Sequence, residues 1–227
     1  MTKQSLILLP GLMSDKTIWQ HQYQHLQNIA NIKIVELNED SSEKMVTNVL
    51  DHAPKQFALA GHSMGGWLAL EIMKTVPNRV TKLCLLNTTA RNDSLEKHSH
   101  RKCMIEAVNN GQFLQIANKI ATNFVYNQMI KKDVLNMFLR VGKQVFINQQ
   151  TAMINRDECI SILPNITCPT LVIHAQKDNN FSIEMHEELA HNILNAKLEL
   201  VKDSGHMSPM EKPQAVTALM RYWLECF

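Results

Sequence analysis

Residues 57–67, FALAGHSMGGW, carry the strongest structural signal in this chain. The apolar run at 57–60 is strand-like, and the stretch after Ser63 is helix-like as far as residue 76. A strand, a sharp turn with the pattern G-x-S-x-G and a helix, in this order, are typical of a nucleophile elbow. Glycines at positions 61 and 65 suit the turn, because a side chain at either place would clash where strand and helix crowd together. The pattern predicts that Ser63 is presented as a nucleophile.

The residue after the serine is predicted to take part in the same chemistry. Met64 would be the first residue of the helix, so its backbone N–H has no partner within the helix. That N–H would point at the space above Ser63, where it and the helix dipole would stabilise a developing oxyanion. A glycine-rich turn without a catalytic role is the alternative, because so short a pattern often occurs by chance. The flanking strand and helix favour catalysis.

An acid and a histidine follow the elbow in the order that this architecture requires. Residues 170–174 are β-branched and strand-like, and Asp178 follows them in a polar turn. Residues 198–201 are again strand-like, and His206 follows in a loop rich in Gly, Ser and Pro. Both side chains are expected at the ends of strands, where Asp178 could orient the imidazole of His206 toward Ser63.

Other roles are open for these residues and their neighbours. Asp178 could be a turn former, since an Asp-Asn-Asn sequence is common at a loop tip, and His206 could be a surface residue. Asp203 is the main rival acid; we favour Asp178, because it follows a strand of its own whereas Asp203 shares the histidine's loop. His62, the variable residue of the elbow, is expected to face away from the serine, and His186 is expected to be solvated.

The N-terminal segment offers a second oxyanion donor. Residues 5–9 are apolar and strand-like and run into a turn at Pro10 and Gly11. In this architecture the loop after the first central strand contributes a backbone N–H, which here would come from Leu12. An ordinary strand-to-helix turn and a signal peptide are the alternatives. The signal peptide is disfavoured, because Pro10 breaks the apolar run and no small-residue cleavage site follows.

Strand-like and helix-like segments alternate along most of the chain. This alternation predicts an α/β fold with a mostly parallel central sheet flanked by helices. Residues 91–162 instead show four helix-like segments, which we interpret as a helical cap inserted over the carboxyl ends of the strands. The core would comprise 1–90 and 163–227. Expected strands lie at 5–9, 32–37, 57–60, 82–87, 170–174 and 197–201, and expected helices at about 16–28, 42–53, 64–76, 182–193 and 213–225.

Composition limits the function classes. A chain of 227 residues suits one domain, and no apolar stretch is long enough to span a bilayer. The net charge of +2 does not indicate a nucleic-acid partner. Five cysteines without CxxC spacing indicate reduced thiols in a cytoplasmic protein. The sequence has no metal-ligand cluster and no phosphate-binding glycine loop, so we expect neither a metal nor another cofactor.

Positive charge is concentrated in the expected cap. Residues 91–162 hold ten Lys and Arg against six Asp and Glu, a net +4, and the rest of the chain has a net −2, which together give the total of +2. A basic cap could attract an acidic acyl carrier protein or an anionic acyl chain. Solvated helix faces are the alternative, because most basic runs are of that kind. The cations in question are Arg91, Arg101, Lys102, Arg140 and Lys143.

Several segments together resemble the α/β-hydrolase superfamily, and the likeness extends over nearly the whole chain. They are LLPGLMSDKTIW at 8–19, GHSMGG at 61–66, LLNTTAR at 85–91, CPTLVI at 168–173 and SGHM at 204–207. Within the superfamily they look like small bacterial carboxylesterases of the pimeloyl-carrier-protein methyl esterase and enol-lactone hydrolase type. Many relatives have His-Gly where this chain has Pro10 and Gly11, a difference that leaves the N–H of Leu12 in place.

The resemblance implies a triad of Ser63, Asp178 and His206, with the N–H groups of Leu12 and Met64 as oxyanion hole. The reaction expected from these residues is hydrolysis of a small-molecule carboxylic ester through an acyl-enzyme. A lactone or carbon–carbon bond hydrolase with the same triad is an alternative reaction. An alternative of another class is a ligand receptor or regulatory protein that retains the triad for recognition.

Overall fold

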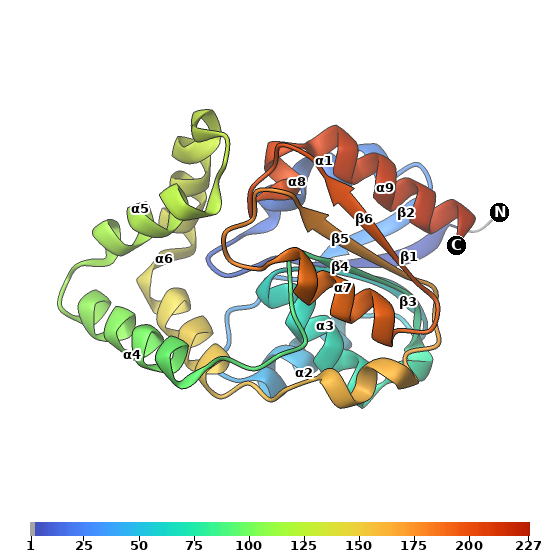
Figure 1. Cartoon of the computed structure of the whole chain (residues 1–227), viewed down its shortest axis with the longest axis horizontal. Helices are drawn as coiled ribbons and strands as arrows, with labels where there is room; N and C mark the ends of the chain where they lie inside the picture. Colours follow the sequence, from blue (N-terminus) through green and yellow to red (C-terminus); the bar gives the residue numbers. More distant parts are fainter. Residues whose placement is uncertain (1–2) are drawn as a thin grey trace.

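The computed structural model describes residues 3–227, and its centre is one six-stranded sheet (Figure 1). The strand order is β2-β1-β3-β4-β5-β6, and every neighbouring pair is parallel. All six strands therefore end at the same edge of the sheet, where the loops that follow them meet. The strands are β1 (Gln4–Leu9), β2 (Ala30–Ile34), β3 (Phe57–His62), β4 (Val80–Leu86), β5 (Thr170–Ala175) and β6 (Ala196–Val201).

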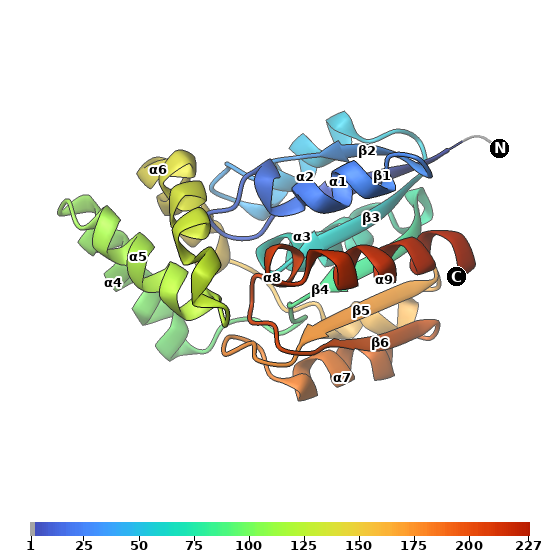
Figure 2. The ribbon, with the colours of Figure 1, turned by 90° about the horizontal axis from the view of Figure 1, so that it is seen from above.

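Helices cover both faces of the sheet, as Figure 2 shows from above. On one face lie α2 (Ser42–His52), α3 (Met64–Thr75) and α7 (Ile183–Asn192), and on the other α1 (Gln20–Leu26) and α9 (Pro213–Cys226), the latter preceded by the short α8 (Ser208–Glu211). Side chains alternate between the faces along a strand: Ile7 and Leu9 join the core under α3, while Leu6 and Leu8 join the core under α9. The predicted doubly covered parallel sheet is confirmed.

Two expected element boundaries are wrong. The strand expected at 32–37 is β2, Ala30–Ile34; Val35 and Leu37 are buried beyond it, so the apolar pattern outlasts the strand. The helix expected from 16 to 28 is divided into a 3-10 turn, η1 (Lys16–Trp19), and α1. A local cap accompanies this division. The Asp15 carboxylate accepts the N–H of Thr17 at 2.8 Å and so caps the beginning of η1, ahead of α1.

The chain between β4 and β5 forms a group of helices on one side of the sheet, at the carboxyl ends of the strands (Figures 1 and 2). They are α4 (Leu95–Asn109), α5 (Phe113–Phe124), the 3-10 turn η3 (Gln128–Ile130) and α6 (Lys131–Ile154), which is broken at Gly142. We call this group the inserted helices. That residues 91–162 constitute a separate cap domain stays a prediction. Two further 3-10 turns are η2 (Pro77–Arg79) and η4 (Ile160–Asn165).

A buried carboxylate ties the inserted helices to the loop after β6. Glu211 Oε2 accepts the backbone N–H groups of Tyr126 and Asn127, at 2.9 and 2.8 Å, just beyond the end of α5. The N–H of Met207 also donates to the carbonyl of Phe124, at 3.3 Å. These contacts fix the segment that carries His206 against the end of α5.

The turn between β3 and α3 has a strained backbone and lies close to neighbouring main chain. Ser63 has φ 54° and ψ −115°, a conformation that costs a non-glycine residue strain energy. The start of α3 lies close to the end of β1. A Cβ atom added at Gly65 would lie only 2.4 Å from the carbonyl oxygen of Leu9. The glycine is thus required by contact with another strand.

We expect Gly65→Ala to lower the free energy of unfolding by about 3 kcal/mol or more, because the backbone atoms that it would strike cannot move aside cheaply. Gly111→Ala is the control. Gly111 ends α4 at φ 85° with open space around its Cβ position, so only conformational strain of about 1 kcal/mol is at stake. Urea unfolding of both variants measures the difference, and equal losses would contradict the crowding argument.

Candidate active site

Ser63 is held in place by its own backbone. Its N–H donates to the carbonyl of Leu86 at 2.9 Å, and its carbonyl accepts the hydroxyl of Thr88 at 2.8 Å and the N–H of Gly66 at 2.9 Å. Both Leu86 and Thr88 belong to the end of β4 and the loop that follows it. The neighbouring strand therefore sets the direction in which the Ser63 side chain leaves the turn.

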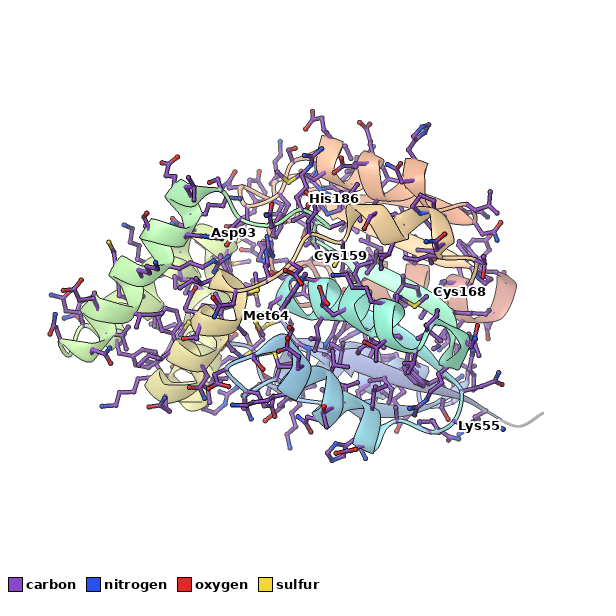
Figure 3. The ribbon with its side chains drawn as sticks, turned by 90° about the horizontal axis from the view of Figure 1, so that it is seen from below. Lys55, Met64, Asp93, Cys159, Cys168 and His186 are labelled. Atoms are coloured by element: carbon purple, nitrogen blue, oxygen red, sulfur yellow. The ribbon has the colours of Figure 1, made fainter. Side chains whose placement is uncertain are left out.

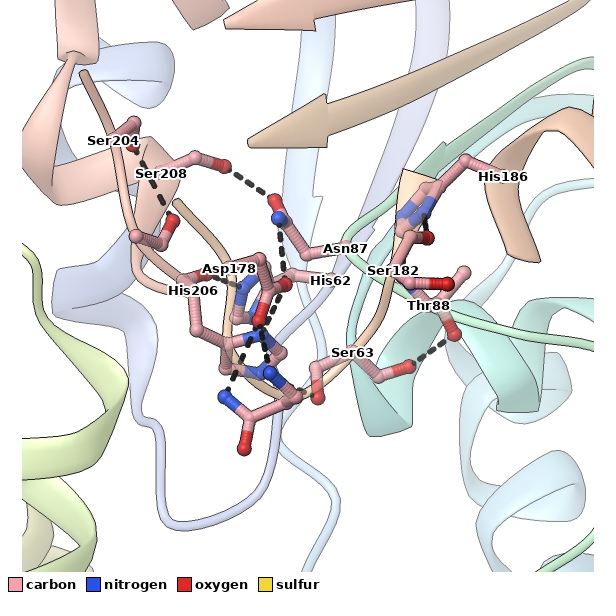
Figure 4. Close-up of polar contacts among 12 residues, drawn as sticks. His62, Ser63, Asn87, Thr88, Asp178, Ser182, His186, Ser204, His206 and Ser208 are labelled. Carbon is pink, nitrogen blue, oxygen red and sulfur yellow. Dashed lines mark hydrogen bonds and ion pairs between the residues drawn. The ribbon is translucent and has the colours of Figure 1, made fainter. Parts of the chain in front are cut away.

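A continuous series of hydrogen bonds joins the three residues singled out in the sequence (Figure 4). His206 Nε2 lies 2.9 Å from Ser63 Oγ, and His206 Nδ1 lies 2.8 Å from Asp178 Oδ2. The side chains of His206 and Asp178 are 1% and 0% exposed. Because a carboxylate only accepts, Nδ1 carries a proton, and Nε2 of the neutral ring is free to accept the serine proton.

The loops after β5 and β6 are bonded to each other, which brings the acid beside the histidine. The N–H of Gln176 donates to the carbonyl of Val201 at 2.9 Å, and that of Lys177 donates to the carbonyl of Ser204 at 2.8 Å. Asp203, the rival acid, lies in an exposed turn at φ 50°. Within residues 3–227, no contact joins its carboxylate to His206, so the residue that the structure brings to the imidazole is Asp178.

The buried Asp178 carboxylate receives further hydrogen bonds. Asn180 donates its N–H to Oδ1 at 2.8 Å, and the Asn87 side-chain amide donates to Oδ2 at 2.9 Å. Burial by itself would raise the pKa of Asp178, but the charge of His206 and these hydrogen bonds hold that pKa well below its usual range. Asn87 is in turn fixed by the hydroxyl of Ser208, 2.6 Å from its Oδ1.

Asn87 is a site residue that sequence reasoning missed. It stands directly after β4, at φ 48°, and its side chain meets the loop after β5. The available signal was its position: a polar residue at the carboxyl end of a central strand, next to the strand that carries the acid. Its amide is the part of the site that touches both Asp178 and the start of α8 through Ser208.

His62 was expected to face away from the serine, and the structure shows that it lies buried against His206, a contact that sequence reasoning missed. Its ring is 1% exposed, with its centroid 4.9 Å from that of His206, and its Nε2 donates to the carbonyl oxygen of His206 at 2.7 Å. Burial, assisted by the charge of His206, lowers the pKa of His62 to about 3. Side chains alternate along a strand, and at the end of β3 this places His62 on the side of the loop after β6. There its neutral ring supports the backbone of His206.

His186 was expected to be solvated, and that expectation is wrong. Its side chain is fully buried, its Nδ1 donates to the carbonyl of Ser182 at 2.9 Å, and its Nε2 accepts the N–H of Thr88 at 3.3 Å. Burial lowers the pKa of His186 to about 4. The polar pattern of α7 concealed one inward position, from which the imidazole supports the Thr88 loop that holds Ser63.

The two expected oxyanion donors lie beside the serine. Leu12, Met64 and Ser63 line one cavity, and within residues 3–227 no hydrogen bond engages the backbone N–H of Leu12 or Met64. The Leu12 loop is held by Gln149 of α6, whose Oε1 accepts the N–H of Met13 at 2.8 Å. Sequence reasoning missed Gln149, which is buried and braces the loop after β1.

The cavity has a volume of about 310 Å³ and lies between the core and the inserted helices. His206 forms one side of it, enclosed by the rings of Phe124 and Phe181, whose centroids lie 4.5 and 5.6 Å from the imidazole. Apolar walls around a serine and a histidine exclude water and thereby strengthen the polar contacts inside the cavity. Met104, Ile120 and Met153 complete the apolar part of the lining.

The basic residues of the inserted helices are largely engaged. Arg91 forms an ion pair with Glu188, Arg140 with Asp15, and Arg101 with Asp93, whereas Lys102 and Lys143 are exposed. An acidic carrier protein as partner stays a prediction. Among residues 3–227, no group of three or more His, Cys, Asp or Glu could hold a metal ion. No helix in this range is long and apolar enough to cross a membrane.

The lowered pKa values of His62 and His186 predict a loss of stability in mild acid. In the unfolded chain both imidazoles have the ordinary pKa of 6.5, whereas in the folded protein they titrate near 3 and 4. Below pH 6.5 the unfolded state therefore binds more protons than the folded state, so the free energy of unfolding falls as pH decreases. Each imidazole contributes roughly 1.4 kcal/mol per pH unit between about pH 6 and 4.5.

Urea unfolding at several pH values measures this slope. His186→Gln should reduce it by roughly 1.4 kcal/mol per pH unit, and His191→Gln, at an exposed position of the same helix, should leave it as in the unmodified protein. A slope that His186→Gln does not change would show that another group carries the acid sensitivity.

Comparisons with known proteins agree with this fold. The (E)-2-((N-methylformamido)methylene)succinate hydrolase of Acinetobacter baylyi is 26% identical over 174 residues, which cover 74% of this chain and 64% of that relative's length. The pimeloyl-[acyl-carrier protein] methyl ester esterase of Vibrio vulnificus is 19% identical over 229 aligned positions, with 92% of this chain and 90% of the relative covered. A thermophilic esterase from Thermogutta terrifontis superposes with a TM-score of 0.90 at 25% identity, over 98% of this chain and 90% of that one.

The resemblance inferred from the sequence motifs is thus confirmed at the level of the fold and of hydrolase relatives. A family model described as "Alpha/beta hydrolase family" matches residues 6–219, which include the elbow, the inserted helices and the loops that carry Asp178 and His206. The chain belongs to the alpha/beta hydrolase family.

Proposed function

We propose that this chain is a serine hydrolase that cleaves carboxylic esters through an acyl-enzyme. One observation carries the proposal: Asp178, His206 and Ser63 are joined by hydrogen bonds of 2.8 and 2.9 Å at the wall of a cavity. A nucleophile, a base within hydrogen-bond reach and a group that orients the base are the parts that acyl transfer requires. The esterase and hydrolase names of the relatives support the same reaction class.

In the first half of the reaction, Ser63 Oγ attacks the ester carbonyl carbon while His206 Nε2 takes the hydroxyl proton. The carbonyl oxygen becomes an oxyanion, which the N–H groups of Leu12 and Met64 stabilise. When the tetrahedral intermediate collapses, the bond to the alcohol oxygen breaks, and His206 returns the proton to that oxygen. The alcohol leaves, and the acyl group remains bonded to Ser63.

In the second half, water takes the place of the alcohol. His206 removes a proton from water, the hydroxide attacks the acyl carbon, and the same N–H groups stabilise the second oxyanion. Collapse releases the carboxylic acid and returns the proton to Ser63. Asp178 keeps Nδ1 of His206 protonated throughout, so that Nε2 is always the atom that exchanges protons with Ser63, alcohol and water.

Ser63→Ala should reduce turnover of p-nitrophenyl esters by about 10³-fold or more, because only oxyanion stabilisation and substrate binding would remain. The fold should be unaffected, which thermal unfolding checks. Retention of a tenth of the activity by a correctly folded variant would contradict the assignment of Ser63. Substrate binding by the unmodified protein with at most one turnover would instead favour a receptor.

The two candidate acids can be separated by a matched pair of variants. Asp178→Asn should lower kcat by roughly 10² to 10⁴, because the imidazole loses the acceptor that sets its tautomer. Asp203→Asn should cost less than about tenfold, since Asp203 lies in an exposed turn whose φ of 50° an asparagine adopts readily. Steady-state kinetics with one ester decide between them, and the reverse ranking would overturn the choice of Asp178.

A further inference from the structure

One wall of the cavity is built from charged and polar residues that the reaction does not use. Asp93 comes just before α4, Arg101 lies on α4 and Gln150 lies on α6, and all three line the cavity together with Ser63. Figure 3 shows Asp93 where the chain enters the inserted helices and Met64 at the start of α3, both at the side of the core that faces those helices. The inserted helices thus supply the charged wall, and the core supplies the nucleophile.

The charges in this wall do not balance. The Asp93 carboxylate, 2% exposed, pairs with two guanidinium groups: Arg101 through Oδ2 and Arg156 through Oδ1, the latter at 2.8 Å. The side chains of Arg101 and Arg156 are only 16% and 3% exposed. One carboxylate can neutralise one guanidinium, so one positive charge remains. Burial lowers the pKa of Arg156 to about 10, and the nearby charge of Arg101 acts in the same direction, against the opposing effect of Asp93.

Two hydrogen-bond donors in this wall have no acceptor within residues 3–227. Arg101 donates through Nε to Asp93 and through Nη1 to Gln150 Oε1 at 2.7 Å, and within residues 3–227 no acceptor engages its Nη2. Gln150 is fully buried, and its Nε2 has no partner in this range. A buried amide without an acceptor costs about 1–3 kcal/mol, a cost that an acceptor bound in the cavity would remove.

The surroundings favour an anion as that acceptor. Lys97 and His100 of α4 also line the cavity, and Lys97 lies near enough to Asp93 to lower the pKa of its carboxyl group. A carboxylate is the small anion whose oxygens match the parallel N–H groups of a guanidinium, and charge-assisted bonds of this kind are stronger than neutral ones. The volume of about 310 Å³ is at the lower end for ligand pockets and suits a short acyl chain.

We propose that the substrate is a half-ester of a dicarboxylic acid, whose free carboxylate binds Arg101 Nη2 and Gln150 Nε2 while its ester carbonyl lies at Ser63. This inference rests on the ester hydrolysis proposed above and names its substrate class. The free carboxylate takes no part in the chemistry: Ser63 attacks the esterified carboxyl, the alcohol departs with the proton from His206, and water releases the diacid. Because the carboxylate lies on the acyl side, it anchors the acyl-enzyme through both half-reactions.

The test compares matched substrates. Monomethyl esters of dicarboxylic acids from succinate to pimelate are each measured against the methyl ester of the monocarboxylic acid with the same number of carbons. We expect kcat/KM for the half-ester to exceed that of its neutral partner by about tenfold or more at the chain length that spans the cavity. If the neutral esters are hydrolysed and no half-ester is preferred at any length, the carboxylate site is refuted while ester hydrolysis stands.

Variants of the wall locate the effect. Arg101→Met should bring the ratio of the two kcat/KM values down to about 1, a loss of about tenfold or more, and Gln150→Leu should lower the ratio by a smaller factor, since each removes a donor to a charged group. Arg101→Met leaves Asp93 paired with Arg156, which protects the fold. Lys102→Met is the control: Lys102 follows Arg101 on α4 but is exposed and does not line the cavity. An unchanged ratio in Arg101→Met, or an equal loss in Lys102→Met, would overturn the proposal.

A binding measurement separates this proposal from the proposed function. In Ser63→Ala, monomethyl adipate is titrated by calorimetry, and we expect binding that Arg101→Met weakens by about 10- to 100-fold and that the neutral methyl hexanoate does not reproduce. If the unmodified protein hydrolyses no ester but this binding is observed, ester hydrolysis fails and the carboxylate site is supported. If the two ligands bind Ser63→Ala equally, the carboxylate site fails.

Discussion

The arrangement of the site depends on a buried carboxylate. The side chain of Asp178 is 0% exposed, and an ionised carboxyl at such a position is costly unless hydrogen bonds replace its water. Here His206, Asn87 and Asn180 provide them, from the loops after β6, β4 and β5. The need to satisfy one charge thereby holds three loops together, and the imidazole between Asp178 and Ser63 acquires one orientation.

The inserted helices complete the site from the other side. Gln149 and Gln150 are neighbours on α6, and consecutive residues of a helix point about 100° apart. Gln149 holds the N–H of Met13 and so braces the loop that carries Leu12, while Gln150 faces the cavity beside Arg101. Glu211 adds the reverse connection, from the loop region of His206 to the chain beyond α5. The core and the inserted helices therefore position each other's contributions.

The loops at the strand ends and the inserted helices line different parts of the cavity. Ser63, His206 and Asp178 all lie in loops at the strand ends, an arrangement that many members of a fold can share without sharing substrates. The groups that could distinguish one acyl chain from another come from α4, α5 and α6. Because these three residues and the cavity wall lie on different parts of the chain, the wall can change its charge and shape while the hydrogen bonds of Asp178, His206 and Ser63 remain.

Local patterns in the sequence determined the alternating strands and helices, the elbow at Ser63 and the order in which Asp178 and His206 follow, because each is written in consecutive residues with a fixed period or spacing. Only the tertiary structure decided which polar residues meet them. Met13 and Gln149 are 136 residues apart, and Asn87 and Asp178 are 91 apart, so no local pattern announces either pair. The same reason explains why the sequence did not reveal the contacts of His62 and His186. Both look polar and ordinary in sequence, and packing against the loops of His206 and Thr88 is what buries them.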